Sequence, residues 1–239
     1  MTEVLSYQAD LLACPDWEDY LCTHARTPHG SYNLRLASAA ALHASAAQRL
    51  AWQRADNEFL AMCAALAYGM QLARGDMAAS DPLRALASDP RASVREASIT
   101  ALQYLGKRSH ARLMLELQHY VLGNLYEQIA AVQSAAVPSL LQHPEQACPV
   151  LHLLETVTAS LARSAHTGTA LHQTLMQTLA QGWALAAAAL PHEGLPMLEA
   201  WVRAPSEAVR AVLMDILTSG PLQRAEPAWC AVQREQLVG

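Results

Sequence analysis

One helix–turn–helix pattern occurs twice in this chain of 239 residues and constrains the fold more than any other feature. The first copy spans residues 83–102 and the second spans residues 198–217, so a constant offset of 115 residues relates them. In each copy an apolar helix end precedes a proline, and three residues separate this proline from a Val-Arg pair that opens a second apolar helix. The recurrence predicts a helical unit that the chain uses more than once. The matching positions are Leu83, Leu86, Pro90, Val94, Arg95 and Leu102 in the first copy and Leu198, Trp201, Pro205, Val209, Arg210 and Leu217 in the second.

The second helix of each copy carries one apolar stripe at helical spacing. A single helix of this kind is marginal in water and is stabilised when its stripe is buried on a neighbour. We expect Gly106 to end the first of these helices with a left-handed cap and Gly220-Pro221 to end the second. Upstream of the first copy, Asp81 is expected to cap a helix that has Pro82 at its first position.

The composition favours helices throughout the chain. Hydrophobic residues make up 52% of the sequence, alanine and leucine dominate, and aromatic residues make up only 5%. Stretches of strand-like alternation are missing from the sequence. The predicted helices, besides the two copies, span residues 6–13, 17–25, 32–54, 57–74, 108–136 (with a bend near Gly123), 144–163 and 169–190.

No long linker rich in glycine, serine or proline divides the chain, which predicts a single helical-repeat domain over residues 1–239. Within it, residues 1–30 are expected to form an acidic N-terminal cap, and residues 75–106 and 192–220 are the clearest repeats. Residues 136–192 carry very few charges, which favours central packing of the helices there, with a face covered by a partner as the alternative. The number of repeats between residues 106 and 192 stays open.

The turn Asp89-Pro90 followed by Val94-Arg95 resembles a HEAT-like repeat, and the second copy departs from that pattern by having Ala204 in place of the aspartate. The resemblance covers under a fifth of the chain. It implies an all-α fold, namely a right-handed α-solenoid of antiparallel helix pairs that is partly irregular. It also implies that the arginines fasten the turns by bonding turn carbonyls or an acid in the next repeat. The structural repeat residues are then Asp89, Pro90, Val94, Arg95, Pro205, Val209 and Arg210.

The net charge of −5 arises entirely in the first 20 residues, which hold five acids and no base. The rest of the chain is neutral, so no overall basic field attracts nucleic acid. All basic residues except Lys107 are arginines, a bacterial-like composition. Several arginines nevertheless gather near the first copy and, with one tryptophan, form the candidate binding surface: Arg84, Arg91, Arg95, Arg108, Arg112 and Trp52.

Patterns typical of catalytic or metal sites are weak. Cys14, Cys22, His24 and His29 lack the spacing of a zinc site, and Glu116 and His119 form the sequence's only Glu-x-x-His pair, where a di-iron site needs two. The sequence holds no P-loop, G-x-G-x-x-G, G-x-S-x-G or H-E-x-x-H motif. We therefore predict no catalytic residue, no cofactor and no metal, and lean against an enzyme.

The predicted function is that of a macromolecular scaffold, with another protein as the expected partner. Scattered cysteines and the lack of a signal peptide or membrane segment favour a cytoplasmic protein with no membrane partner. One alternative is a HEAT-like enzyme that acts on DNA or a cofactor, of the alkylpurine-glycosylase or lyase type, with a carboxylate beside Trp52 or Tyr104. A second alternative is nucleic-acid binding through the arginine-rich helix face.

Overall fold

The computed structural model describes residues 2–164, 168–203, 206–218 and 220–238, with side chains from Tyr7 onward. Within these ranges the chain forms 15 α-helices and two short 3-10 helices, and it contains no strand. The predicted all-α fold class is therefore confirmed. Pro205, one of the expected structural repeat residues, lies outside the described residues.

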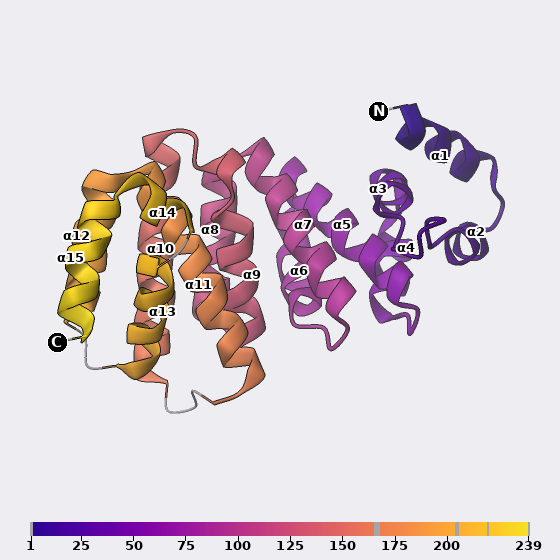
Figure 1. Cartoon of the computed structure of the whole chain (residues 1–239). Coiled ribbons are helices and arrows are strands. Elements are labelled where there is room, and N and C mark those ends of the chain that lie inside the picture. Colours follow the sequence, from indigo (N-terminus) through magenta and orange to yellow (C-terminus); the bar gives the residue numbers. More distant parts are fainter. Residues whose placement is uncertain (1, 165–167, 204–205, 219, 239) are drawn as a thin grey trace. The chain divides into compact units, whose positions relative to one another are not determined.

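The chain forms two compact units, Met1–Ser109 and His110–Gly239, here called the N-terminal unit and the C-terminal unit (Figure 1). The expected single repeat domain stays a prediction. The helices of the N-terminal unit are α1 (Thr2–Ala13), α2 (Trp17–Thr23), α3 (Leu34–His43), α4 (Ala46–Arg54), α5 (Glu58–Arg74), η1 (Met77–Ala79), α6 (Ser80–Ala87) and α7 (Ala92–Arg108). Those of the C-terminal unit are α8 (His110–Val121), α9 (Leu125–Ala135), η2 (Pro138–Leu140), α10 (Pro144–Arg163), α11 (Ala170–Ala189), α12 (Pro191–Val202), α13 (Glu207–Thr218), α14 (Gly220–Ala225) and α15 (Pro227–Val238).

Helix α5 is the centre of the N-terminal unit. It packs against α3, α4, α6 and α7, and every residue from Phe59 to Met70 is buried. The approach of α5 to α7 is closest at Gly69, where an added Cβ would lie 2.5 Å from the Cβ of Ala101. Only glycine fits between these two helices without a shift of the backbone.

Helix α11 has the same central place in the C-terminal unit, where it packs against α9, α10, α12, α13 and α14. Its Trp183 is 1% exposed, and the indole Nε1–H donates to the hydroxyl of Thr158 on α10 over 2.9 Å. The charge-poor segment identified in the sequence contains this helix, because a helix enclosed on several sides excludes charged residues.

Each copy of the repeated pattern contains two successive helices, α6 and α7 in the first copy and α12 and α13 in the second. Equivalent residues of the two copies are buried to a similar degree: Val94 and Val209 are both 0% exposed, and Leu102 and Leu217 are at most 1% exposed. The second helix of each copy thus buries the same positions of the pattern.

Four local expectations are wrong. The predicted helix 32–54 divides into α3 and α4 because Ser45 caps a new helix through a capping box with Gln48. The predicted helix 108–136 divides into α8 and α9 because the Asn124 side chain caps α9. Helix α7 continues through Gly106 to Arg108, and Asp81 lies within the first turn of α6, while Asp76 caps the 3-10 helix before it.

Candidate functional site

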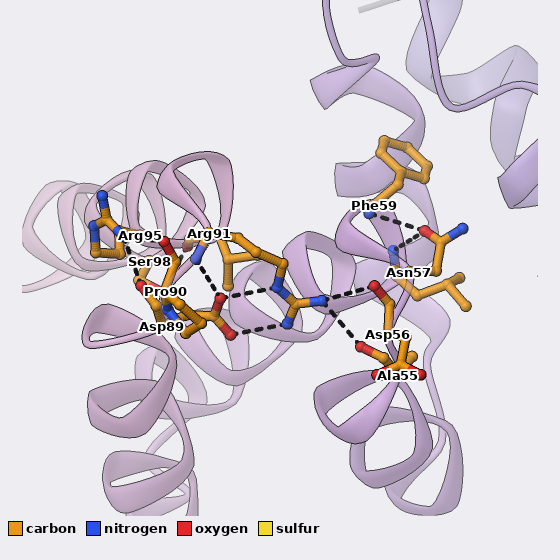
Figure 2. A network of polar contacts seen from close by, with 11 residues as sticks. Ala55, Asp56, Asn57, Phe59, Asp89, Pro90, Arg91, Arg95 and Ser98 are labelled. Atoms are coloured by element: carbon orange, nitrogen blue, oxygen red, sulfur yellow. Dashed lines mark hydrogen bonds and ion pairs between the residues drawn. The ribbon is translucent and has the colours of Figure 1, made fainter.

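A network of hydrogen bonds joins two turns of the N-terminal unit through Arg91 (Figure 2). The Nε and Nη2 atoms of Arg91 each donate to one carboxylate oxygen of Asp89 over 2.8 Å. Its Nη1 donates to the carbonyls of Ala55 and Asp56 over 3.0 and 3.1 Å. Since Ala55 and Asp56 connect α4 to α5, Arg91 ties that turn to the turn between α6 and α7.

Arg95 strengthens the same turn from the other side. Its Nη1 donates to the carbonyl of Asp89 over 2.6 Å and to that of Pro90 over 2.8 Å, as Figure 2 shows. Helix α7 therefore begins on a turn whose carbonyls are held by side-chain donors. We call the four residues Asp89, Pro90, Arg91 and Arg95 the turn clip.

The turn clip changes the acidity of its carboxyl group. Burial acts to raise the pKa of Asp89, but the hydrogen bonds and positive charge of Arg91 outweigh burial and hold this pKa below its ordinary value. A carboxylate with a lowered native pKa stabilises the fold above its unfolded pKa of about 3.9, and this stability is lost as the pH falls through the native value.

We expect Arg91→Ala to lower the free energy of unfolding at pH 7 by about 1–3 kcal/mol, because a carboxylate that is only 12% exposed loses its bidentate partner. Asp89→Asn should cost a similar amount at pH 7 but flatten the loss of stability that begins below about pH 4. Urea unfolding at pH 7 and pH 3 measures both effects. Arg108→Ala, on an exposed side chain of the same unit, is the control, and an equal pH dependence in Asp89→Asn and the parent would contradict the ionic role.

A second network extends the turn clip toward α3. The hydroxyl of Tyr32 donates to Glu58 Oε2 over 2.6 Å, and this bond is the largest cause that lowers the pKa of Glu58, which Ser93 also hydrogen-bonds. The Tyr32 ring stacks on Phe59 at a centroid distance of 5.9 Å, and the Arg26 guanidinium lies 4.2 Å from its centroid on the ring face. The segment before α3 is thereby fixed to the start of α5.

A groove of 240 Å³ lies beside these networks, between α3 and α7 and above α5. We call it the α3–α7 groove. Buried Met62 and Ala97 contribute apolar surface, and the rim carries exposed Leu34, Glu96 and Thr100. Glu96 is the one charged residue among those that line it, while four of them carry hydroxyl groups. The lining residues are Ser31, Tyr32, Leu34, Met62, Ser93, Glu96, Ala97 and Thr100.

Two hollows flank α11 in the C-terminal unit and share Gln181 and Leu185. The larger, of 310 Å³, reaches Asp215 on α13 and Pro221 on α14. The smaller, of 220 Å³, reaches Gln133 on α9 and Pro138 beyond it. Exposed amides over small apolar residues make this a surface that can hydrogen-bond a polypeptide backbone.

The residues of the predicted binding surface occupy different environments. Trp52 is fully buried and stacks on Trp17 at a centroid distance of 6.4 Å, so its ring forms no surface. Arg91 and Arg95 meet in the turn clip. Arg84 is half-buried on α6, and Arg108 is exposed with its guanidinium 5.9 Å from the Tyr104 ring centroid. Arg112 is exposed on α8 of the C-terminal unit, and Arg210 is exposed on α13, next to buried Val209.

The described residues contain no group of three or more histidine, cysteine or acidic side chains arranged to hold a metal ion. Glu116 is buried while His119, three residues on, is exposed. Cys63 is a core residue with no exposed surface, and burial raises the pKa of its thiol well above its ordinary range, which opposes formation of a thiolate. Among the helices of these ranges, none combines the length and apolar character needed to cross a membrane.

Comparison of the chain with protein-family models, with curated proteins and with solved structures gave no match.

The lining of the α3–α7 groove was not identified from the sequence, although part of its signal is present there. Ser93, Glu96, Ala97 and Thr100 follow helical spacing and lie on one face of α7. Ser31 and Tyr32 are far from α7 in the sequence. The packing of the chain around α5 and the hydrogen bond from Tyr32 to Glu58 bring them to the groove.

Proposed function

We propose that the chain is a protein-binding helical-repeat protein and that the α3–α7 groove contacts its partner. The observation that carries this proposal is the combination, in one groove, of an apolar floor, a hydroxyl rim and a single carboxylate. The HEAT-like solenoid arrangement is part of the same proposal. It is supported by the order in which the helices of the N-terminal unit pack. Helix α5 packs on both α3 and α7, α4 contacts α5, and α6 contacts α7.

The chemistry of the groove selects a basic side chain of the partner. Tyr32 and Ser93 both use their hydroxyl hydrogens on Glu58, so their oxygens are available to a ligand only as acceptors. Glu96 adds a negative charge on an exposed rim. A lysine or arginine complements such a site because its alkyl stem packs on Met62 and Leu34 while its charged end donates to the acceptors.

A photo-crosslinking experiment tests this proposal. With p-benzoylphenylalanine at position 100 we expect a covalent adduct with another protein in cells, and Glu96→Lys should reduce its yield at least about tenfold, as a like-charge contact requires. The same probe at exposed Leu50 on α4 is the matched control and should give no adduct sensitive to Glu96→Lys. Adducts with nucleic acid, or protein adducts that Glu96→Lys leaves unchanged, would contradict the proposal.

A further inference from the structure

A separate cavity of 370 Å³ lies between α8 and α10, within the C-terminal unit. We call it the α8–α10 cavity. Its volume is more than twice the roughly 150 Å³ that holds one benzene molecule and falls in the range of about 300–1,000 Å³ typical of small-molecule sites. The lining residues are Met114, Leu117, Gln118, Val121, Cys148, Pro149, His152, Leu153 and Thr156.

Most of the cavity wall is apolar. Leu117, Val121 and Leu153 are at most 8% exposed, and Met114 adds a flexible thioether that adapts to the shape of a guest. Pro149 lies inside α10, where its ring replaces the amide hydrogen that would otherwise bond the carbonyl four residues earlier. These groups favour an apolar body over a polar one.

Polar groups lie at the exposed rim of the same cavity. Gln118, His152 and Thr156 are exposed, and the Thr156 hydroxyl donates to the His152 carbonyl over 2.9 Å. The amide of Gln118 and the imidazole of His152 both offer donors and acceptors. One polar end of a ligand would therefore find partners at the rim while its body remains between the helices.

The charges around the cavity disfavour an anion. None of the nine lining residues is a lysine or arginine, and two carboxylates lie close by. Glu155 Oε2 is 3.6 Å from His152 Nδ1, and Glu193 accepts a hydrogen bond from the Cys148 thiol, which raises the pKa of that thiol. The raised pKa lowers the thiolate fraction of Cys148 and so disfavours a covalent reaction at this residue.

We propose that the α8–α10 cavity binds a small uncharged molecule with an apolar body of bicyclic-aromatic size and one hydroxyl or amide group at the Gln118–His152 rim. The inference is independent of the protein-binding groove, because the two sites share no residue.

The test uses 2-naphthalenemethanol as the probe and the methyl resonances of methionine as the readout. We expect the probe to shift the Met114 methyl resonance of the full chain and to leave that of Met62, which lines the α3–α7 groove, unchanged. The matched anion 2-naphthoate should bind at least about tenfold more weakly, since a carboxylate would face Glu155 and Glu193.

Variants then localise the binding. Gln118→Leu should weaken the alcohol about tenfold. Met114→Trp, which places a larger side chain in the cavity wall, should weaken binding at least about tenfold in saturation-transfer measurements. Gln181→Leu, on α11 and away from the cavity, is the control and should bind as the parent does. The proposal is overturned if the alcohol shifts no Met114 resonance, if it shifts Met62 equally, if 2-naphthoate binds as tightly, or if the two cavity variants bind like the control.

Discussion

Replacing Gly69 with valine is expected to lower the free energy of unfolding of the N-terminal unit by about 3 kcal/mol or more. An added Cβ at this position would lie 2.5 Å from the Cβ of Ala101 and 2.9 Å from its Cα and carbonyl oxygen. Two of those three atoms are backbone, so α5 and α7 must separate. The better helix propensity of a non-glycine residue, worth less than about 1 kcal/mol, offsets only part of this cost.

The measurement is urea unfolding followed by circular dichroism, with Gly69→Ala as a graded variant of intermediate effect. Gly168→Val is the matched control, because a Cβ at Gly168 would meet nothing within 4 Å. We expect this control to stay within about 0.5 kcal/mol of the parent. Equal stability of the Gly69 and Gly168 variants would show that α5 and α7 do not pack at the described distance.

Trp52→Ala should lower the free energy of unfolding by about 3–5 kcal/mol, the usual cost of truncating a fully buried large aromatic residue. Trp52→Phe should cost much less than its lost volume suggests, because the buried indole Nε1–H has no hydrogen-bond partner within the described chain and phenylalanine removes this unpaired donor. Stacking on Trp17 predicts a coupling of about 0.5–1.5 kcal/mol in a double-mutant cycle of the two residues.

Trp229→Ala serves as the comparison for this result. Trp229 is half-buried and its Nε1–H donates to Glu199 over 2.8 Å, so its loss should cost about 1–2 kcal/mol. A Trp52→Ala variant as stable as the parent would contradict the core role of Trp52.

The sequence predicted the bounds of a helix correctly where one apolar stripe ended at a residue that terminates helices. The predicted bounds of α5, α10 and α11 agree with the structure to within one residue. The division at Ala44-Ser45 was missed because Ala37, Ala40, Ala41 and Ala44 continue the apolar stripe through it. Its signal was the capping box Ser45-x-x-Gln48, which competes with helix continuation by supplying local hydrogen bonds.

The candidate site could be derived only in part. Asp89, Pro90 and Arg95 were identified from the repeated pattern, and the structure places them in the turn clip. The part played by Arg91 was not foreseen, because its partners at Ala55 and Asp56 precede it by 36 and 35 residues and present carbonyls, which every residue type possesses. Similarly, the hydroxyls of the α3–α7 groove come from two distant segments whose meeting depends on Glu58 and on the fold around α5.

The way in which Arg91 binds its distant turn has a consequence for how this chain tolerates sequence change. On one side it requires a specific carboxylate at position 89, whereas on the other it bonds only main-chain oxygens. Positions 55 and 56 are therefore free to exchange side chains during evolution as long as the path of the backbone is kept. Positions 89 and 91 are constrained together, so that relatives of this protein should retain or lose the two residues as a pair.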